Sequence, residues 1–219
     1  MRTILYLLFF VFGSIIRSEI IYVPDDYSTI QSGINASNDG DTIFVDPGFY
    51  PESIDFNGKT IVVSSLYIIE NDSLLIGLTI IDAQENESVV TFDSEETNSS
   101  ILQGFTVQNG TGNDEDPDGN GSYYTYGGGI YCEGSDPVIR DCIIKDNLAN
   151  EGGGGGIFCY NSSPVFYGCT ISGNETDDVG GGLYARSGSS PQFYNCTFYD
   201  NSAEFGGGCY LRHESTPIM

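Results

Sequence analysis

The sequence predicts an all-β fold in which the chain winds into a parallel β-helix, a solenoid with about 27 residues per coil. From Gly127 onward one unit is written three times and begins a fourth time, so that Pro137, Pro164 and Pro191 are each 27 residues apart. Apolar and polar residues alternate inside each unit, which is the period of a strand. No unit contains a helical pattern, and the repeat fold with several short strands per turn and no helix is the β-helix.

Equivalent residues of successive coils are expected to stack in register, about 4.8 Å apart. Four rows of apolar side chains should then fill the lumen: Ile130, Ile157, Leu183 and Cys209; Ile139, Phe166 and Phe193; Cys142, Cys169 and Cys196; and Ile144, Ile171 and Phe198. A fifth row, Asn147, Asn174 and Asn201, predicts a ladder of hydrogen-bonded amides, with Asn109 placed at its start. The stacked cysteines are expected to be mostly reduced, because parallel Cβ directions suit a disulfide poorly.

The chain divides into three parts. Residues 1–18 are typical of a secretory signal peptide, because Met1-Arg2 precedes an apolar run too short to span a bilayer comfortably, although a retained anchor is the alternative. Residues 19–126 predict an N-terminal cap and irregular coils, with a capping helix at 29–36 and strands at 42–45, 60–65, 75–82, 88–92 and 101–108. Residues 127–219 hold the regular repeats, whose last copy is truncated, so we expect its free edge to promote self-association.

The charge of the chain limits its partners. Acidic residues number 31 against 7 basic ones, for a formal net charge of −24. Such a surface repels nucleic acid and anionic membranes, so neither is expected as a partner, and no membrane span is expected after signal removal. Together with the signal peptide, this composition predicts a secreted or cell-surface protein.

Residues 110–126 exceed the period of the repeat and predict an acidic insertion that projects from a turn. Asp114, Asp116, Asp118 and Asn120 alternate along it in the manner of the start of a calcium-binding loop. Thr125, however, stands where such a loop carries glutamate. Two interpretations stay open, a calcium site and a plain solvated acidic turn.

One outer face of the repeats is the predicted binding surface. If the first row faces the lumen, strand alternation turns Tyr131, Phe158, Tyr184 and Tyr210 outward, with Tyr160, Arg186 and Arg212 on the same face. Sugar rings pack on aromatic side chains and guanidinium groups bind carboxylates, so this pattern favours an extracellular polysaccharide that contains uronates. The alternative is that the rings only stack on one another and that nearby acids neutralise the arginines.

Two stretches resemble known families. Residues 23–31, 40–45 and 47–52 look like the N-terminal cap and first coil of secreted bacterial right-handed parallel β-helix proteins of the pectate lyase-like superfamily, and residues 127–132 are similar to their repeats. This resemblance implies the right hand of the helix. Residues 198–201 also resemble a motif of polymorphic outer-membrane proteins. None of the catalytic motifs that the superfamily implies is matched, and a fold alone assigns no reaction.

Three functions therefore stay open. The protein could bind extracellular polysaccharide without turning it over. It could instead be an adhesin or surface structural protein that contacts a cell-surface component. The third possibility is that the protein is a polysaccharide lyase or glycoside hydrolase whose catalytic coils lie beyond residue 219. The sequence leaves undecided whether the protein is an enzyme.

Overall fold

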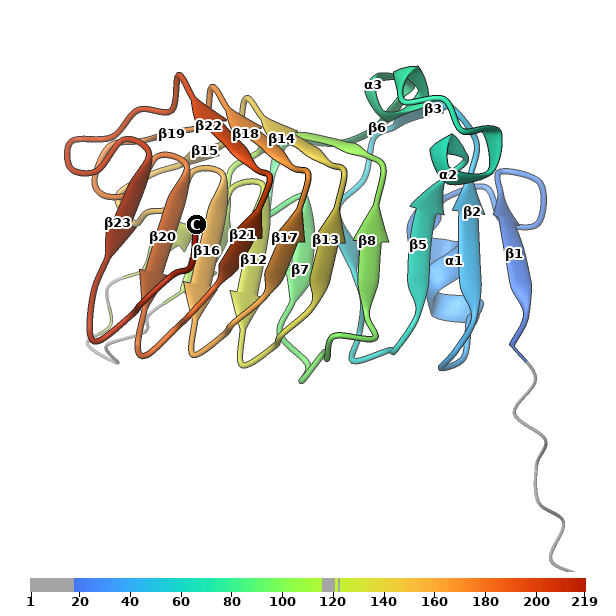
Figure 1. Ribbon diagram of the computed structural model, residues 1–219, viewed down its shortest axis with the longest axis horizontal. Coiled ribbons are helices and arrows are strands. Elements are labelled where there is room, and N and C mark those ends of the chain that lie inside the picture. Colours follow the sequence, from blue (N-terminus) through green and yellow to red (C-terminus); the bar gives the residue numbers. More distant parts are fainter. Residues whose placement is uncertain (1–17, 116–120, 122) are drawn as a thin grey trace, which may run out of the picture.

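Three parallel β-sheets form the walls of a β-helix in the computed structural model, which describes residues 18–115, 121 and 123–219. Most coils contribute one strand to each sheet, and we call the sheets A, B and C in the order in which the chain visits them. The strands pair in parallel with those of the next coil and lie side by side from the blue N-terminal end to the red C-terminal end (Figure 1). The predicted parallel β-helix is therefore confirmed.

Sheet A has seven strands and sheets B and C have six each. Sheet A contains β1 (Ile20–Val23), β2 (Thr42–Val45), β5 (Val62–Ser65), β8 (Ile101–Gln103), β13 (Val138–Arg140), β17 (Val165–Tyr167) and β21 (Gln192–Tyr194). Sheet B contains β3 (Gly48–Tyr50), β6 (Thr79–Asn86), β9 (Thr106–Gly110), β14 (Ile143–Lys145), β18 (Thr170–Ser172) and β22 (Thr197–Tyr199). Sheet C contains β4 (Ile54–Asp55), β7 (Val90–Phe92), β12 (Ile130–Glu133), β16 (Ile157–Tyr160), β20 (Leu183–Arg186) and β23 (Cys209–Leu211).

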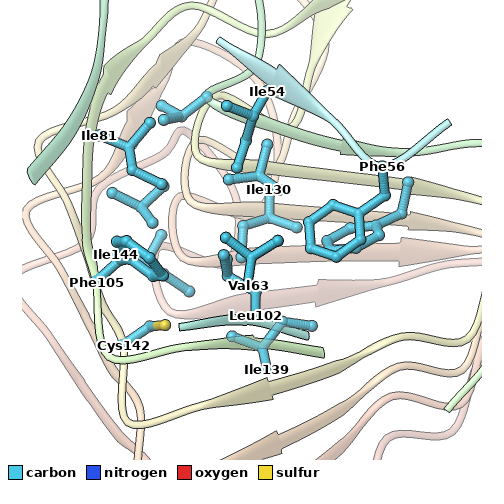
Figure 2. Close-up of a cluster of buried hydrophobic side chains, with 14 of the residues drawn as sticks. Ile54, Phe56, Val63, Ile81, Leu102, Phe105, Ile130, Ile139, Cys142 and Ile144 are labelled. Atoms are coloured by element: carbon cyan, nitrogen blue, oxygen red, sulfur yellow. The ribbon is translucent and has the colours of Figure 1, made fainter. Parts of the chain in front are cut away.

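The hydrophobic core fills the lumen between the sheets. Figure 2 shows its side chains converging from three sides: Val63, Leu102 and Ile139 from sheet A, Ile81 and Ile144 from sheet B, and Ile54 and Ile130 from sheet C. The predicted rows are in register, since Ile130 pairs with Ile157 and Ile157 with Leu183. Because these side chains are fully buried, each contributes roughly 1.5–3 kcal/mol to stability.

Helix α1 (Ile30–Ala36) covers the open end of the first coil, as predicted. It buries Ile30 and Ile34 against the core beside β1, β2 and β4, so the helix closes the apolar lumen at this end. The carboxylate of Glu52 accepts hydrogen bonds from two backbone N–H groups of the first turn. The amine of Lys59 donates to three carbonyls at the other end of the helix, which suits the helix dipole.

Helices α2 (Tyr67–Glu70) and α3 (Leu74–Leu78) form a flap between β5 and β6. The prediction of a strand at 75–82 was wrong in its first half, because a short apolar run fits a helix as well as a strand. Four side chains of the flap, Ile68, Ile69, Leu74 and Leu78, are more than half exposed. The hydroxyl of Tyr67 donates to Asp141 at 2.7 Å and fastens the flap to a later coil.

The amide ladder is present inside the corner that follows sheet B. Asn174 Oδ1 accepts from the backbone N–H and from Nδ2 of Asn147, and Asn201 Oδ1 accepts from the same two groups of Asn174. The prediction that Asn109 starts this ladder was wrong by one position. The register aligns Gly110 with Asn147, whose Oδ1 accepts from the Gly110 N–H, while Asn109 donates to Asp82 instead.

Candidate functional site

The predicted aromatic row lies on the outer face of sheet C, in the expected register. Tyr131 pairs with Phe158, Phe158 with Tyr184, and Tyr184 with Tyr210. The expectation that this row is exposed was wrong, because Tyr131, Phe158 and Tyr184 are only 2%, 1% and 2% exposed. Such side chains offer no surface on which a sugar ring could pack.

A second layer of chain covers these rings. Tyr126, which ends β11 (Tyr124–Tyr126), bridges to Gly153, Gly153 to Val179, and Val179 to Phe205, so the cover is itself a parallel ladder. The rings of Tyr126 and Phe158 stack 4.6 Å apart. At Gly153 a Cβ would approach the Val179 carbonyl oxygen to 2.5 Å, so glycine is required for the cover to lie this close.

The remaining predicted binding residues lie beside this cover. The guanidinium of Arg186 lies 5.3 Å from the centre of the Tyr160 ring, and Arg186 is only 4% exposed. Arg212 is exposed, and its charge opposes the rise that burial causes in the pKa of Asp178. The packed rings match the part of the alternative interpretation in which the aromatic residues stack on one another. Neutralisation of the arginines by nearby acids stays a prediction.

The predicted calcium ligands can be followed only in part. Asp114 lies in β10 (Asn113–Glu115), which pairs antiparallel with β11. Asp116, Asp118 and Asn120 lie outside the described residues. Among the residues that the structure does describe, no group of three or more His, Cys, Asp or Glu side chains is arranged to hold a metal ion. Calcium therefore stays an untested expectation.

No described segment covers sheet C near its N-terminal end, where a cleft of about 840 Å³ opens. Its floor is formed by β4 and β7, from which Asp55 and its paired neighbour Thr91 face away from the lumen. Gln31 and Asn35 of α1 contribute one wall, and the β10–β11 hairpin contributes another. The covering layer begins at Tyr126, so the cleft and the buried aromatic row share one sheet face.

Hydrogen bonds fix the floor and walls of the cleft. Gln31 exchanges two hydrogen bonds with the backbone of Asp55, which ties α1 to β4. Asn113 donates to the hydroxyl of Thr91 at 3.2 Å and accepts from the Ser88 N–H at 3.1 Å, which ties the hairpin to β7. Gln31, Asn113 and Thr91 are therefore held in place before any ligand arrives.

The cleft is acidic. Six lining residues carry carboxyl groups, and no lysine or arginine occurs among the described residues that line it: Asp55, Glu85, Glu87, Asp93, Asp114 and Glu115. Burial raises the pKa of Asp55 above its ordinary value, and the charges of Asp93 and Glu96 raise it further. A backbone hydrogen bond from Asn57 acts in the opposite direction. Carboxyl groups with raised pKa values in a cleft are typical of functional sites.

Glu115 is the second perturbed carboxyl group. Burial raises its pKa, as do the charges of Glu133, Asp93 and Asp114, while the polar Tyr131 hydroxyl beside it lowers the pKa. The single proton of the Tyr131 hydroxyl is donated to Glu133 Oε2 at 2.6 Å, so Tyr131 joins the two carboxyl groups. A raised pKa increases the protonated fraction of a carboxyl group, and a protonated carboxyl group can donate a hydrogen bond to a ligand as well as accept one.

The sequence did not reveal this cleft because the irregular coils hide their register. The paired residues Ile54 and Val90 are 36 positions apart, and Val90 and Ile130 are 40 apart, whereas the pairs of the later coils are 26 or 27 apart. Strand alternation in residues 54–56 and 90–92 does indicate that Asp55 and Thr91 face outward. The sequence did not show that these two residues lie side by side on neighbouring strands.

These features define the class of protein. The chain matches the family described as "Right handed beta helix region" over residues 15–219, so it belongs to the right-handed β-helix proteins. It is similar in fold to a solved structure of pectin methylesterase from carrot, with 13% sequence identity over 90% of this chain and 82% of that chain and a TM-score of 0.45.

No curated protein sequence matches the chain. Within the described residues, no helix is long and apolar enough to cross a membrane.

Proposed function

We propose that the protein binds an extracellular glycan whose sugars are neutral or carry amino groups, and that it does so in the acidic cleft on sheet C. The lining of the cleft carries the proposal. Besides its six carboxyl groups, the lining offers five side-chain amides and four hydroxyl groups within about 840 Å³. Sugars present many hydroxyl groups, each of which both donates and accepts, and such a lining can satisfy them.

Charge determines which glycan fits. The chain carries −24, and the cleft adds no basic group among its described lining residues. A polyuronate would meet like charge throughout, which costs binding energy. The expected preference for uronates depended on Arg186 and Arg212, which lie outside the cleft. We therefore favour uncharged or cationic sugars over uronates.

Binding assays on the full chain test this proposal. Calorimetric titration should detect a neutral β-glucan or a chito-oligosaccharide but not polygalacturonate. Asp55→Asn should weaken binding about 10-fold or more, the effect of a lost hydrogen bond to a charged group. Asp200→Asn removes an equal charge at an exposed position away from the cleft and is the matched control. Preferential binding of polygalacturonate, or equal affinity of both variants, would refute the proposal.

The same samples separate binding from turnover. Asp55 and Glu115 are the candidate proton donors and acceptors of a hydrolase, because their pKa values are raised. New reducing ends that appear with the parent and not with Glu115→Gln would assign catalysis to the cleft. Binding without new ends would leave a binding protein.

The adhesin interpretation has one observation in its favour. The flap presents Ile68, Ile69, Leu74 and Leu78, each more than half exposed, and Phe49 on sheet B is 55% exposed. Exposed apolar patches mark contact surfaces for other proteins. Replacing Ile68, Ile69 and Leu74 with serine should abolish adhesion to cells and leave glycan binding intact if the flap is such a surface.

A further inference from the structure

Nine of the 15 asparagines in the chain are followed, two positions later, by serine or threonine, with no proline between. Serine and threonine together make up 37 of the 219 residues, so chance would produce about 2.5 such cases. The pattern Asn-x-Ser/Thr is the acceptor signal for N-linked oligosaccharide in secreted proteins. One case, at Asn120, lies outside the described residues and is left aside.

The eight described cases fall into two groups. In four of them the side-chain amide is already engaged: Asn35 with Gln31, Asn86 with the Ala83 carbonyl, Asn109 with Asp82, and Asn174 inside the amide ladder. Asn174 is also fully buried, so a sugar attached to it could not be accommodated in the folded coil. These four amides are poor candidates for carrying a glycan.

The other four, Asn71, Asn98, Asn161 and Asn195, are exposed, and no hydrogen bond holds their amide groups among the described residues. Three of them have left-handed backbone, with φ of 51°, 49° and 55° for Asn71, Asn161 and Asn195. Asn98 lies in a turn closed by the hydrogen bond from Ser100 N to the Thr97 carbonyl. Each is therefore at the tip of a turn or corner, where a bulky substituent extends into solvent.

We propose that Asn71, Asn98, Asn161 and Asn195 are acceptor sites for N-linked oligosaccharide. The donor class is a polyprenyl pyrophosphate-linked oligosaccharide. A bond forms between Asn Nδ2 and the anomeric carbon of the first sugar as the bond from that carbon to the phosphate oxygen breaks. The amide gives up one proton to a base of the transferring enzyme, and polyprenyl pyrophosphate leaves as the anion. No oxidation or reduction takes place.

The positions of these four residues leave the proposed glycan cleft open. None of them lines the cleft, whereas Asn35 and Asn86, whose amides are engaged, do. Oligosaccharides on the four acceptors would therefore cover corners of the β-helix without blocking the cleft. They would also shield part of the exposed surface of the flap, because Asn71 ends helix α2.

Translation of the full chain with secretory microsomes tests the proposal. A second form, with residues 1–18 replaced by an established cleavable signal peptide, ensures that the chain reaches the glycosylating compartment. Electrophoresis should show up to four stepwise shifts that peptide-N-glycosidase removes, and peptide mapping should assign them to the four acceptors. Absence of shifts from both forms would overturn the proposal.

Single variants identify each acceptor. Asn195→Gln and Thr197→Ala should each remove the same single shift, because the second keeps the asparagine and removes only the hydroxyl of the signal. Asn38→Gln is the matched control, since Asn38 is exposed but is not followed by the signal. Glycans that map to Asn174 or Asn109 instead of the four acceptors would overturn the selection by exposed, unengaged amides.

Discussion

Replacement of Asn174 by alanine should destabilise the β-helix more than the same change at Asn201, the next member of the amide ladder. Asn174 is fully buried, and its side chain takes part in four hydrogen bonds. Its Oδ1 accepts from the backbone N–H and Nδ2 of Asn147, and its Nδ2 donates to the Ile144 carbonyl and to Asn201. Alanine removes all four at once.

The size of the destabilisation depends on the polar groups that lose their hydrogen-bond partners when Asn174 is truncated. The buried N–H of Asn147 loses its acceptor, which costs about 1–3 kcal/mol, and each further lost bond costs about 0.5–1.5 kcal/mol. Asn147 Nδ2 keeps the Val107 and Lys145 carbonyls as partners, so part of the loss is offset. We therefore expect Asn174→Ala to lower the free energy of unfolding by about 2–5 kcal/mol.

Asn201→Ala is the matched control. Asn201 has the same position in its coil but is only partly buried, so water can replace its bonds, and we expect a loss of about 1–2 kcal/mol. Urea denaturation followed by circular dichroism and tyrosine fluorescence measures both, since the chain has 15 tyrosines and no tryptophan. A loss at Asn174 below about 1 kcal/mol, or one no larger than at Asn201, would refute this account of the ladder.

Two further predictions concern titrating groups. A hydrogen bond with Cys169 lowers the pKa of Cys196 to about 7, whereas burial raises that of Cys132, so a maleimide at neutral pH should label Cys196 first. Peptide mapping that finds Cys132 labelled first would contradict this. Because the pKa of Asp55 is raised in the fold, the folded state holds its proton more tightly than the unfolded chain, and stability falls as pH rises from the ordinary carboxyl pKa through the raised one. Asp55→Asn should reduce that fall in denaturation curves at pH 4 to 7, and an unchanged slope would speak against a raised pKa.

The repeated part of the fold was predictable because its landmarks recur. Pro137, Pro164 and Pro191 set the register. Once Ile130 was assigned to the lumen, strand alternation predicted which neighbouring side chains point inward and which point outward. The irregular coils gave no such reference. Their strand spacing varies with the flap and the hairpin, so the alignment of Asp55 with Thr91 depends on contacts distant in sequence.

The periodicity of the sequence could not predict whether the outward-facing side chains of sheet C are exposed to solvent. Alternation correctly turned Tyr131 and Phe158 away from the lumen, but whether a residue outside one layer meets water depends on what else packs there. The cover consists of residues near Gly153 and Val179, which read as turns in the sequence. Glycine runs that permit close backbone approach were the available signal, because they allow a second layer to form.

The outer ladder also bears on how the protein could change length during evolution. Gly153 and Val179 occupy equivalent places in successive repeats, so each repeat carries its own share of sheet, amide ladder and cover. A duplication or loss of one whole repeat by unequal recombination would therefore preserve every type of contact between coils. The acidic cleft lies on β4 and β7, in the irregular N-terminal coils and away from the regular repeats, so its lining would not change. The number of repeats could thus change the length of the β-helix without changing the ligand that the cleft binds.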